Sequence, residues 1–364
     1  MKQFSLLIIV VLISFSCKKE YQPRTIEKIN IQEFKKDSSS IRAIHVMDSE
    51  SLYYASSDGI IGFTKSDGKK WGEHNFIKIN NNDTIIPNFR SIAYNGTAVF
   101  ALSIGNPALL YKVNNKSKTT NLVYTETHEK VFYDSMKFFS DGKHGIAVGD
   151  PTENCPSIIL TSDGGNTWTK LPCEKLPAFE EGEAFFAASN TNIKVINSTV
   201  WIASGGTKAR ILKSSDFGQT WDVYNTPIIQ GDGPQGIYSI DFYDENNGIA
   251  IGGNYAKPND NCANKAITSD GGKTWTLIAD NQNPNYKSCA QYVPDTNGKE
   301  VFAVGKTGVS FSNDGGHTWA KVSNDSYYTI QFVDKNTAWL SGHQKIGKLV
   351  LPSMKWTGFK IKKS

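Results

Sequence analysis

The chain has 364 residues, and 39 lysines and arginines against 35 aspartates and glutamates give it a formal net charge of +4. The basic residues are spread along the sequence and form no stripe interleaved with aromatic residues, which argues against a nucleic-acid-binding surface. Beyond the first few dozen residues the composition does not change, so we expect a single folded domain of about 325 residues.

The N-terminus has the pattern of a secretory signal. A basic start is followed by an apolar run over residues 6–15, which is too short to span a bilayer. The small residue before Cys17 completes a sequence that resembles a bacterial lipobox. We therefore predict a signal peptide over residues 1–16 and a lipid anchor on Cys17, with an ordinary cleaved signal as the alternative. The following Lys18-Lys-Glu20 resembles the start of Bacteroidetes-type lipoproteins, which implies a membrane-anchored protein of the cell envelope, periplasmic or at the outer membrane or cell surface.

The segment after the lipobox is polar and charged. Residues 17–38 predict a lipidated tether, which leaves the folded domain at residues 39–364. Within the tether, Thr25–Ile31 alternates apolar and polar residues. We expect this stretch to add a strand to the last unit of the fold and so to close it.

An eight-residue segment recurs along the rest of the chain. It starts with Ser or Thr, has Asp at its third position and Gly at its fifth, and ends on Trp. A weaker copy has Ser66 in place of the aspartate. The Asp and Trp residues of the four strong copies are Asp163 and Trp168, Asp216 and Trp221, Asp270 and Trp275, and Asp314 and Trp319.

The sequence between the copies repeats as well. Alternating apolar runs bounded by Gly, Asn and Asp, such as Ser135–Phe139, are typical of antiparallel strands. A unit of about four strands that repeats every ~50 residues is typical of a β-propeller blade. The interval from Trp71 to Trp168 holds one degenerate unit, and a last unit runs from Tyr328 to Trp356. The sequence therefore predicts an all-β fold, a seven-bladed β-propeller.

The repeated segment resembles the Asp-box, or BNR repeat, of sialidases, sortilin-type receptors and the photosystem II assembly and stability factor family. In those folds it forms the turn between the third and fourth strands of a blade. The resemblance implies a structural role, in which Asp accepts backbone hydrogen bonds, Gly supplies a positive φ and Trp packs between blades. The chain is most similar to the photosystem II assembly factor family, in a bacterial subgroup often loosely labelled oxidoreductase or glycosyl hydrolase. No residue here supports those labels.

Four cysteines remain after Cys17, an even number that suits an oxidising compartment. Cys155 and Cys173 lie symmetrically about the turn at Gly164, so we predict a disulfide between them. Cys262 and Cys289 form the second predicted pair, although Cys289 lies beyond the symmetric position. The other two connectivities stay open.

Propeller topology places the blade-to-blade linkers and the loops between second and third strands on one face, opposite the repeated turns. The long irregular loops gather on this face, where binding groups are expected. Their candidate residues are Asp150, Arg210, Asn254 and Tyr255. Aligned innermost strands place one residue of each blade at the channel mouth: Arg42, Arg90, Asp134, Glu183, Tyr238, Ser288 and Tyr328. Arginines facing acids suit a carboxylate or a peptide, and the alternative is that these groups only pair with one another.

We expect a noncatalytic scaffold that binds a protein or peptide client on this face, with membrane proteins among the candidate clients. The family resemblance implies this mode of action. The alternative is a sialidase-like glycoside hydrolase, for which Glu180-Glu-Gly-Glu183 supplies paired carboxylates. That chemistry needs several clamping arginines, whereas the chain has only four. No histidine pair has metal-ligand spacing and no phosphate-binding loop occurs, so we expect neither metal nor cofactor.

Overall fold

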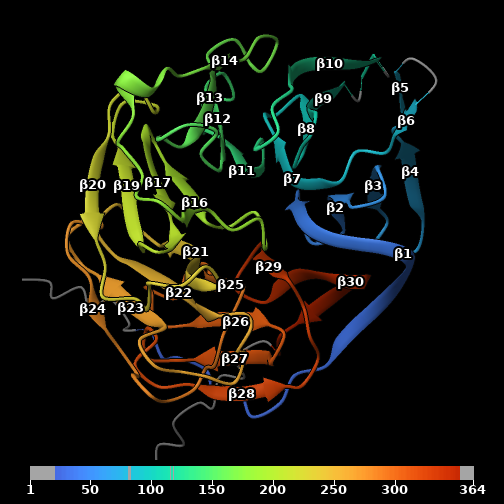
Figure 1. Ribbon diagram of the computed structural model, residues 1–364. Coiled ribbons are helices and arrows are strands. Elements are labelled where there is room, and N and C mark those ends of the chain that lie inside the picture. The colour runs from blue at the N-terminus through green and yellow to red at the C-terminus, as the bar shows by residue number, and fades with distance from the viewer. Residues whose placement is uncertain (1–20, 81–82, 115, 118, 353–364) are drawn as a thin grey trace, which may run out of the picture.

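The computed structural model describes residues 21–80, 83–114, 116–117 and 119–352, and in these ranges the chain is almost entirely β. Its sheets surround a central channel as a ring (Figure 1). The described ranges contain one helical element, the 3-10 turn η1 (Cys173–Lys175). They hold no helix with the length and apolar character needed to cross a bilayer. The predicted signal peptide and Cys17 lie outside the described residues.

The described sheets resolve into seven four-stranded antiparallel blades. Blade 1 takes its inner strand from the second half of β1 (Ile31–Val46) and continues with β2 (Ser51–Ser56), β3 (Ile60–Lys65) and β4 (Trp71–Asn75). Blade 2 consists of β7 (Phe89–Tyr94), β8 (Ala98–Ser103), β9 (Ala108–Asn114) and β10 (Thr119–Glu126). Blade 3 consists of β11 (Tyr133–Phe138), β12 (Gly145–Gly149), β13 (Ser157–Thr161) and β14 (Thr169–Lys170).

The remaining blades follow the same order from the channel outward. Blade 4 consists of β16 (Ile193–Ile196), β17 (Thr199–Ala203), β19 (Arg210–Ser214) and β20 (Asp222–Asn225). Blade 5 consists of β21 (Gln235–Phe242), β22 (Gly248–Asn254), β23 (Lys265–Thr268) and β24 (Thr276–Leu277). Blade 6 consists of β25 (Cys289–Tyr292), β26 (Val301–Gly305), β27 (Gly308–Ser312) and β28 (Ala320–Ser323). Blade 7 contains β29 (Thr329–Phe332), β30 (Thr337–Val350) and the first half of β1.

Two short pairs of strands are added to the blades. A hairpin of β5 (Lys78–Asn80) and β6 (Asp83–Ile85) follows blade 1. The strands β15 (Glu183–Ala184) and β18 (Gly205–Gly206) extend the sheet of blade 5 beyond β21. The inner strands β1, β7, β11, β16, β21, β25 and β29 contact one another in this order and return to β1. The ring is therefore closed.

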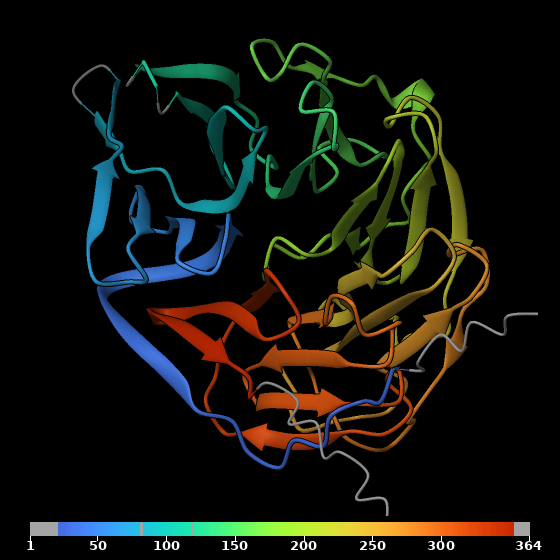
Figure 2. The same ribbon diagram turned by 180° about the vertical axis from the view of Figure 1, so that it is seen from behind.

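The N-terminal strand makes the closure. The first half of β1 pairs with the second half of β30, with Ile31 opposite Leu349. β30 folds back on itself near Gln344, which has φ 57°, because its first half pairs with β29 and the amide of Leu351 donates to the carbonyl of Asn336 at 2.7 Å. Figure 2 shows the N-terminal segment, in blue, passing the outer strands of the orange and red blades before it reaches blade 1.

The expected tether is thus partly folded. The latching strand begins at Ile31 and not at Thr25, and its pairing places residues 31–35 in blade 7. Upstream, Ile26 and Ile29 are buried in the core between blades 6 and 7. The domain therefore starts well before residue 39, because the last blade needs an outer strand from the N-terminus. Trp356, which we expected in the last unit, lies outside the described residues.

Apolar side chains fill the space between each pair of neighbouring blades. Between blades 2 and 3, for example, Phe100 and Phe138 lie 4.7 Å apart between ring centroids, and Trp168 packs edge-on against both. Each buried aromatic or aliphatic side chain contributes about 1.5–3 kcal/mol from burial. Every blade therefore depends on its two neighbours for stability.

The repeated turns join third and fourth strands, as expected. The carboxylate of Asp163 accepts the backbone amides of Asn166 at 2.9 Å and Thr167 at 3.1 Å, and the Thr167 hydroxyl at 2.7 Å. Gly165 has φ 77°, and a Cβ there would lie 2.4 Å from the ring of Phe100. Hydrogen bonds from the amide and hydroxyl of the corresponding threonine recur at Asp216, Asp270 and Asp314.

The tryptophans of these turns pack between blades. Trp168 and Trp275 are 8% exposed, whereas Trp221 and Trp319 are half-buried against the adjoining cores. The weaker copy keeps part of the arrangement, because the hydroxyl of Ser66 accepts the amide of Lys70 at 2.9 Å. The Asp and Trp residues of the repeated turns therefore stabilise the blades, on the face away from the linkers.

The cysteines follow one of the two predicted pairings. Cys155 and Cys173 form a disulfide with their Cα atoms 5.6 Å apart, which confirms that prediction. Cys262 and Cys289 are free, and the prediction that they pair is wrong. Cys262 is exposed in the loop after β22, whereas Cys289 is fully buried at the start of the inner strand β25, with its sulfur 3.6 Å from the carbonyl oxygen of Ile330. The two residues belong to different blades and different depths of the ring.

The first testable contact is the ion pair that fixes the N-terminal segment to blade 6. Arg24 donates to Glu300 through Nε at 2.8 Å and Nη2 at 2.5 Å, and the two side chains are 8% and 0% exposed. Arg24→Met leaves Glu300 charged and buried without its partner, which should cost about 3–5 kcal/mol. Urea unfolding measures this loss, and Arg24→Met combined with Glu300→Gln should recover part of it. Equal urea midpoints for Arg24→Met and the wild type would contradict the assignment.

The repeated turn at Asp163 stabilises the fold to a degree that depends on pH. Partial burial raises the pKa of Asp163, but the hydrogen bonds from the hydroxyl and amide of Thr167 outweigh it and lower the pKa to about 2. Since the folded-state pKa lies below the unfolded value of 3.8, the carboxylate stabilises the fold above about pH 4, and this contribution is lost between about pH 4 and pH 2. Asp163→Asn should lower the neutral-pH melting temperature by about 1–3 °C and reduce the loss in acid.

The control for this experiment is the exposed Asp222→Asn on β20. Its melting temperature should follow that of the wild type from neutral to acid pH. An Asp163→Asn variant with the same pH profile as both would show that the carboxylate does not stabilise the turn.

Candidate functional site

A cavity of about 650 Å³ opens at the mouth of the central channel, on the face that carries the blade-to-blade linkers. We call it the mouth cavity. Of the residues predicted from the sequence, seven line it: Arg42, Arg90, Asp150, Tyr238, Tyr255, Ser288 and Tyr328. They come together because each propeller inner strand starts at this face, so residues far apart in the sequence reach the same opening.

Two arginines from neighbouring blades lie on one side of the mouth cavity. The guanidinium carbon of Arg42 is 4.1 Å from the centroid of the Tyr328 ring, and its Nη1 donates to the carbonyl of Ala188 at 3.3 Å. The guanidinium carbon of Arg90 lies 5.9 Å from the centroid of the Phe132 ring. Burial and the nearby positive charge of Arg42 lower the pKa of Arg90. In the described part of the chain, neither arginine has a carboxylate within 4 Å.

Two aspartates lie at different depths behind these arginines. Asp150 lines the cavity and accepts the backbone amide of Phe185 at 2.7 Å. Burial raises its pKa to about 7. Asp134 is fully buried and does not line the cavity. Neither of its oxygens accepts a hydrogen bond of normal geometry, although the amides of Ala187 and Asp150 lie close enough to favour the charged form.

The protonation of Asp134 follows from this burial. Burial is the larger cause and repulsion from Asp150 the smaller one, and together they raise the pKa of Asp134 well above its ordinary value. The positive charge of Arg90 only partly opposes this shift. Asp134 therefore does not act as the exposed acidic group expected at the mouth. Its exclusion leaves the cavity more basic than the sequence suggested.

Aromatic side chains form the opposite wall. Tyr238 stacks on Phe186 with ring centroids 4.0 Å apart and planes 2° apart, and Tyr286 packs edge-on against it at 4.8 Å. The Tyr238 hydroxyl donates to the carbonyl of Pro234 at 2.8 Å. Tyr255 adds an edge contact at 6.4 Å and is itself 53% exposed. This wall offers rigid apolar surface with an exposed rim, a composition suited to side chains of a peptide.

The floor of the mouth cavity is a segment that crosses the channel. We call residues 187–191 the channel plug. The Ser189 hydroxyl donates to the carbonyl of Ser288 in blade 6 at 2.7 Å, and the Asn190 side chain donates to the carbonyl of Ile92 in blade 2 at 2.8 Å. The side-chain oxygen of Asn190, Oδ1, also accepts the amide of Met136 in blade 3 at 2.9 Å. These bonds tie the plug to inner strands on both sides of the ring.

The plug displaces the inner strand of blade 4 from its predicted position. The inner strand of blade 4 begins at Ile193, ten residues after the predicted Glu183. Glu183 lies instead in β15, with a fully buried side chain paired to Arg210 at 2.5 Å and hydrogen-bonded to Ser204 at 2.6 Å. Neither Glu183 nor Arg210 lines the mouth cavity. Their charges cancel each other within the loop structure of blade 4.

Asn254, the remaining predicted residue, shapes a turn. Its side-chain oxygen accepts the amide of Ala256 at 2.9 Å and that of Lys257 at 3.2 Å, and it does not line the cavity. Its bonds fix the loop that presents Tyr255. Ten lining residues were not predicted from the sequence, among them Phe132, Phe186, Tyr286 and Lys306. The run Phe185-Phe-Ala-Ala188 indicates an irregular segment rather than a strand, because its two aromatic and two small residues do not alternate with polar ones.

The chemical groups that line the cavity are mostly basic and aromatic. Among its described lining residues, one carboxyl group, Asp150, faces the cavity, whereas glycoside hydrolysis uses two. No cluster of three or more His, Cys, Asp or Glu side chains in the described ranges has the arrangement of a metal site. The arginines and Lys306 supply donors for an anionic group, and the aromatic wall supplies apolar contact.

Among known proteins, the matches to this chain are solved structures with a similar fold. No protein-family model and no curated protein matches the chain. A solved structure of YCF48 bound to D1 peptide is 15% identical, with a TM-score of 0.62, and the match covers 90% of this chain and 98% of that chain. YCF48 from Cyanidioschyzon merolae is 13% identical, with a TM-score of 0.56, covering 88% and 98%. The structure of U3-55K is 13% identical, with a TM-score of 0.64, covering 90% and 100%. The chain is therefore a β-propeller, similar in fold to these proteins.

Proposed function

We propose that the protein is a noncatalytic scaffold that binds an acidic or C-terminal segment of a peptide or protein client in the mouth cavity. The observation that carries this proposal is the pair Arg42 and Arg90, which lie on adjacent blades without a carboxylate partner among the described residues. Two neighbouring cations repel each other, and an anion placed between them relieves that repulsion. Carboxylates fit the planar guanidinium groups in bidentate geometry.

The surroundings of the arginines support the same ligand. The guanidinium carbon of Arg42 lies 4.1 Å from the Tyr328 ring centroid, and that of Arg90 lies 5.9 Å from the Phe132 ring centroid. An aromatic face beside an arginine favours one placement of the cation, which lowers the conformational entropy lost on binding. Lys306 adds a third positive charge at the rim. The stacked wall of Tyr238 and Phe186 provides apolar surface for the residues next to the anionic group.

The fold neighbours support a peptide client. One of them is YCF48 in a structure that contains a D1 peptide, so a propeller of this kind has a peptide-bound form. The client of the present chain is proposed to be a protein of the cell envelope, reached by a chain that is anchored through a lipid on Cys17. The residues that support this location are the signal-like N-terminus and the lipobox-like sequence.

The arginine pair gives the test of this proposal. Arg42→Gln and Arg90→Gln remove the charges and retain polar side chains, and each should weaken client binding by about 2 kcal/mol or more, or roughly thirtyfold. The client is first captured from native envelope by crosslinking, and affinity is then measured with synthetic segments of it that have free or amidated C-termini. Lys273→Gln, on a repeated turn of the opposite face, is the matched control.

Melting temperatures of the three variants should stay close to the wild-type value. Equal client affinity for folded Arg42→Gln, Arg90→Gln and Lys273→Gln would contradict the proposed site. If the arginine substitutions weaken binding but amidation of the C-terminus leaves the affinity unchanged, the anionic group is an acidic side chain of the client rather than its C-terminus.

The proposal also predicts the direction of the pH dependence. Because burial raises the pKa of Asp150 to about 7, this carboxyl group is mostly neutral below that pH and negative above it. A negative Asp150 opposes an anionic ligand, so client affinity should be higher at pH 6 than at pH 8. Asp150→Asn keeps the acceptor for the Phe185 amide, and it should raise the affinity at pH 8 and flatten the profile. A steep profile that persists in Asp150→Asn would assign the titration to another group.

A further inference from the structure

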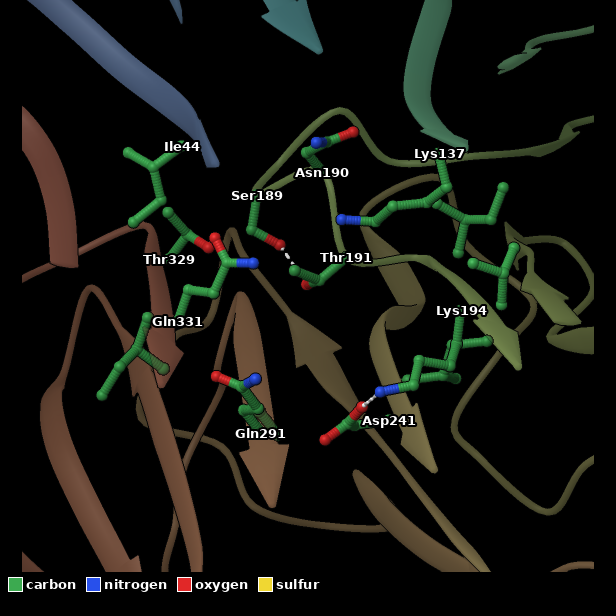
Figure 3. A pocket seen from close by; sticks show the side chains of 15 residues that line it. Ile44, Lys137, Ser189, Asn190, Thr191, Lys194, Asp241, Gln291, Thr329 and Gln331 are labelled. Carbon is green, nitrogen blue, oxygen red and sulfur yellow. Dashed lines mark hydrogen bonds and ion pairs between the residues drawn. The ribbon is translucent and has the colours of Figure 1, made fainter. Parts of the chain in front are cut away.

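A second chamber lies below the channel plug, on the side away from the mouth cavity. It has a volume of about 200 Å³. The plug residues Ser189–Thr191 form one side of it (Figure 3). Its other sides are formed by inner-strand residues that lie further along the channel than those lining the mouth cavity. We call it the channel chamber. Its volume accommodates a few small polar groups but no drug-sized ligand.

The chamber contains a lysine without a partner. Lys137 reaches into it from β11, and Figure 3 shows its ammonium group pointing toward Thr191. No ion pair or hydrogen bond of the Lys137 ammonium occurs within the described residues. Burial, and to a smaller extent repulsion from Lys194, lowers the pKa of Lys137 to about 8. The group therefore still carries a positive charge at neutral pH.

The carboxylate of the chamber is already engaged. Asp241 pairs with Lys194 at 2.5 Å through one oxygen and accepts the backbone amide of Tyr292 at 2.8 Å through the other. Its negative charge is balanced by Lys194, which leaves Lys137 as the uncompensated charge among the described lining residues. The chamber therefore has a net positive charge.

Two glutamines add donors in a fixed orientation. The side-chain oxygen of Gln331 accepts the amide of Val46 at 2.9 Å, and that of Gln291 accepts the amide of Phe332 at 2.7 Å. Since each oxygen is held by a backbone group, each NH2 group is left as a donor. In Figure 3 both side chains lie across the chamber from Lys137, Gln331 beside Thr329 and Gln291 below it.

We propose that the channel chamber is a binding site for a small monocarboxylate that has a further oxygen acceptor, such as a 2-oxo acid. The carboxylate bonds to the Lys137 ammonium, and the NH2 groups of Gln291 and Gln331 donate to the remaining oxygens. The hydrocarbon part of the ligand contacts the apolar lining at Ile44 and Ile240. A carboxylate is favoured over a neutral ligand because it pairs with the positive charge of the half-buried Lys137, which no described side chain compensates.

The test is calorimetric titration of the full folded protein with pyruvate, propionate and propionamide at constant ionic strength. Pyruvate should bind saturably with one site, propionate more weakly, and the neutral propionamide not measurably. Lys137→Met removes the charge and keeps an unbranched side chain that is one atom shorter, and it should weaken pyruvate binding roughly tenfold or more. Gln331→Glu keeps the acceptor for Val46 and replaces the NH2 donor with a negative charge, so it should abolish binding.

Lys208→Met, an exposed change in the loop before β19, is the matched control and should bind as the wild type does. Melting temperatures show whether Lys137→Met and Gln331→Glu are folded. Absence of saturable pyruvate and propionate binding to the wild type would overturn the proposal. Equal pyruvate affinity for folded Lys137→Met and wild type would overturn it as well.

Discussion

The burial of apolar side chains between facing blades is the interaction on which the rest of the structure depends. Each of the seven blades packs against two neighbours, so an open ring would expose the facing surfaces of two blades at once. The first half of β1 prevents this by forming the outer strand of blade 7 while its second half forms the inner strand of blade 1. The ion pair of Arg24 with Glu300 holds the chain that leads into this strand. Closure therefore couples the N-terminal segment to the stability of the whole ring.

Closure also determines where binding groups can lie. The inner strands start at one face, so Arg42 and Arg90 meet although 48 residues separate them in the sequence. The channel plug then divides the channel. On one side it forms the floor of the mouth cavity through Ala187 and Ala188, and on the other it bounds the channel chamber through Ser189 and Thr191. One segment inserted between β15 and β16 thus creates two separate basic cavities along the same axis.

The sequence predicted the features that repeat. Apolar alternation and the turns around Asp163 and its three equivalents predicted the blades, because these patterns express local backbone geometry. It also placed Arg42, Arg90, Tyr238 and Tyr328 at the channel mouth. It failed where the chain departs from the repeat. Glu183 was assigned to an inner strand because the insertion before β16 contains an apolar run, although this run does not alternate as a strand does. The paired charges of Glu183 and Arg210, and the burial of Asp134, depend on contacts between distant segments that periodicity does not encode.

The central claim is that a client occupies the mouth cavity, and site-specific photocrosslinking in native envelope tests it most directly. A photoreactive residue replaces Tyr255 or Ser326, which line this cavity, or Lys273, which lies on the opposite face. The account predicts the same crosslinked client from Tyr255 and Ser326 and none from Lys273, with a free anionic client segment competing for the adduct. Adducts from Lys273 alone, or adducts of equal yield from all three positions, would contradict it.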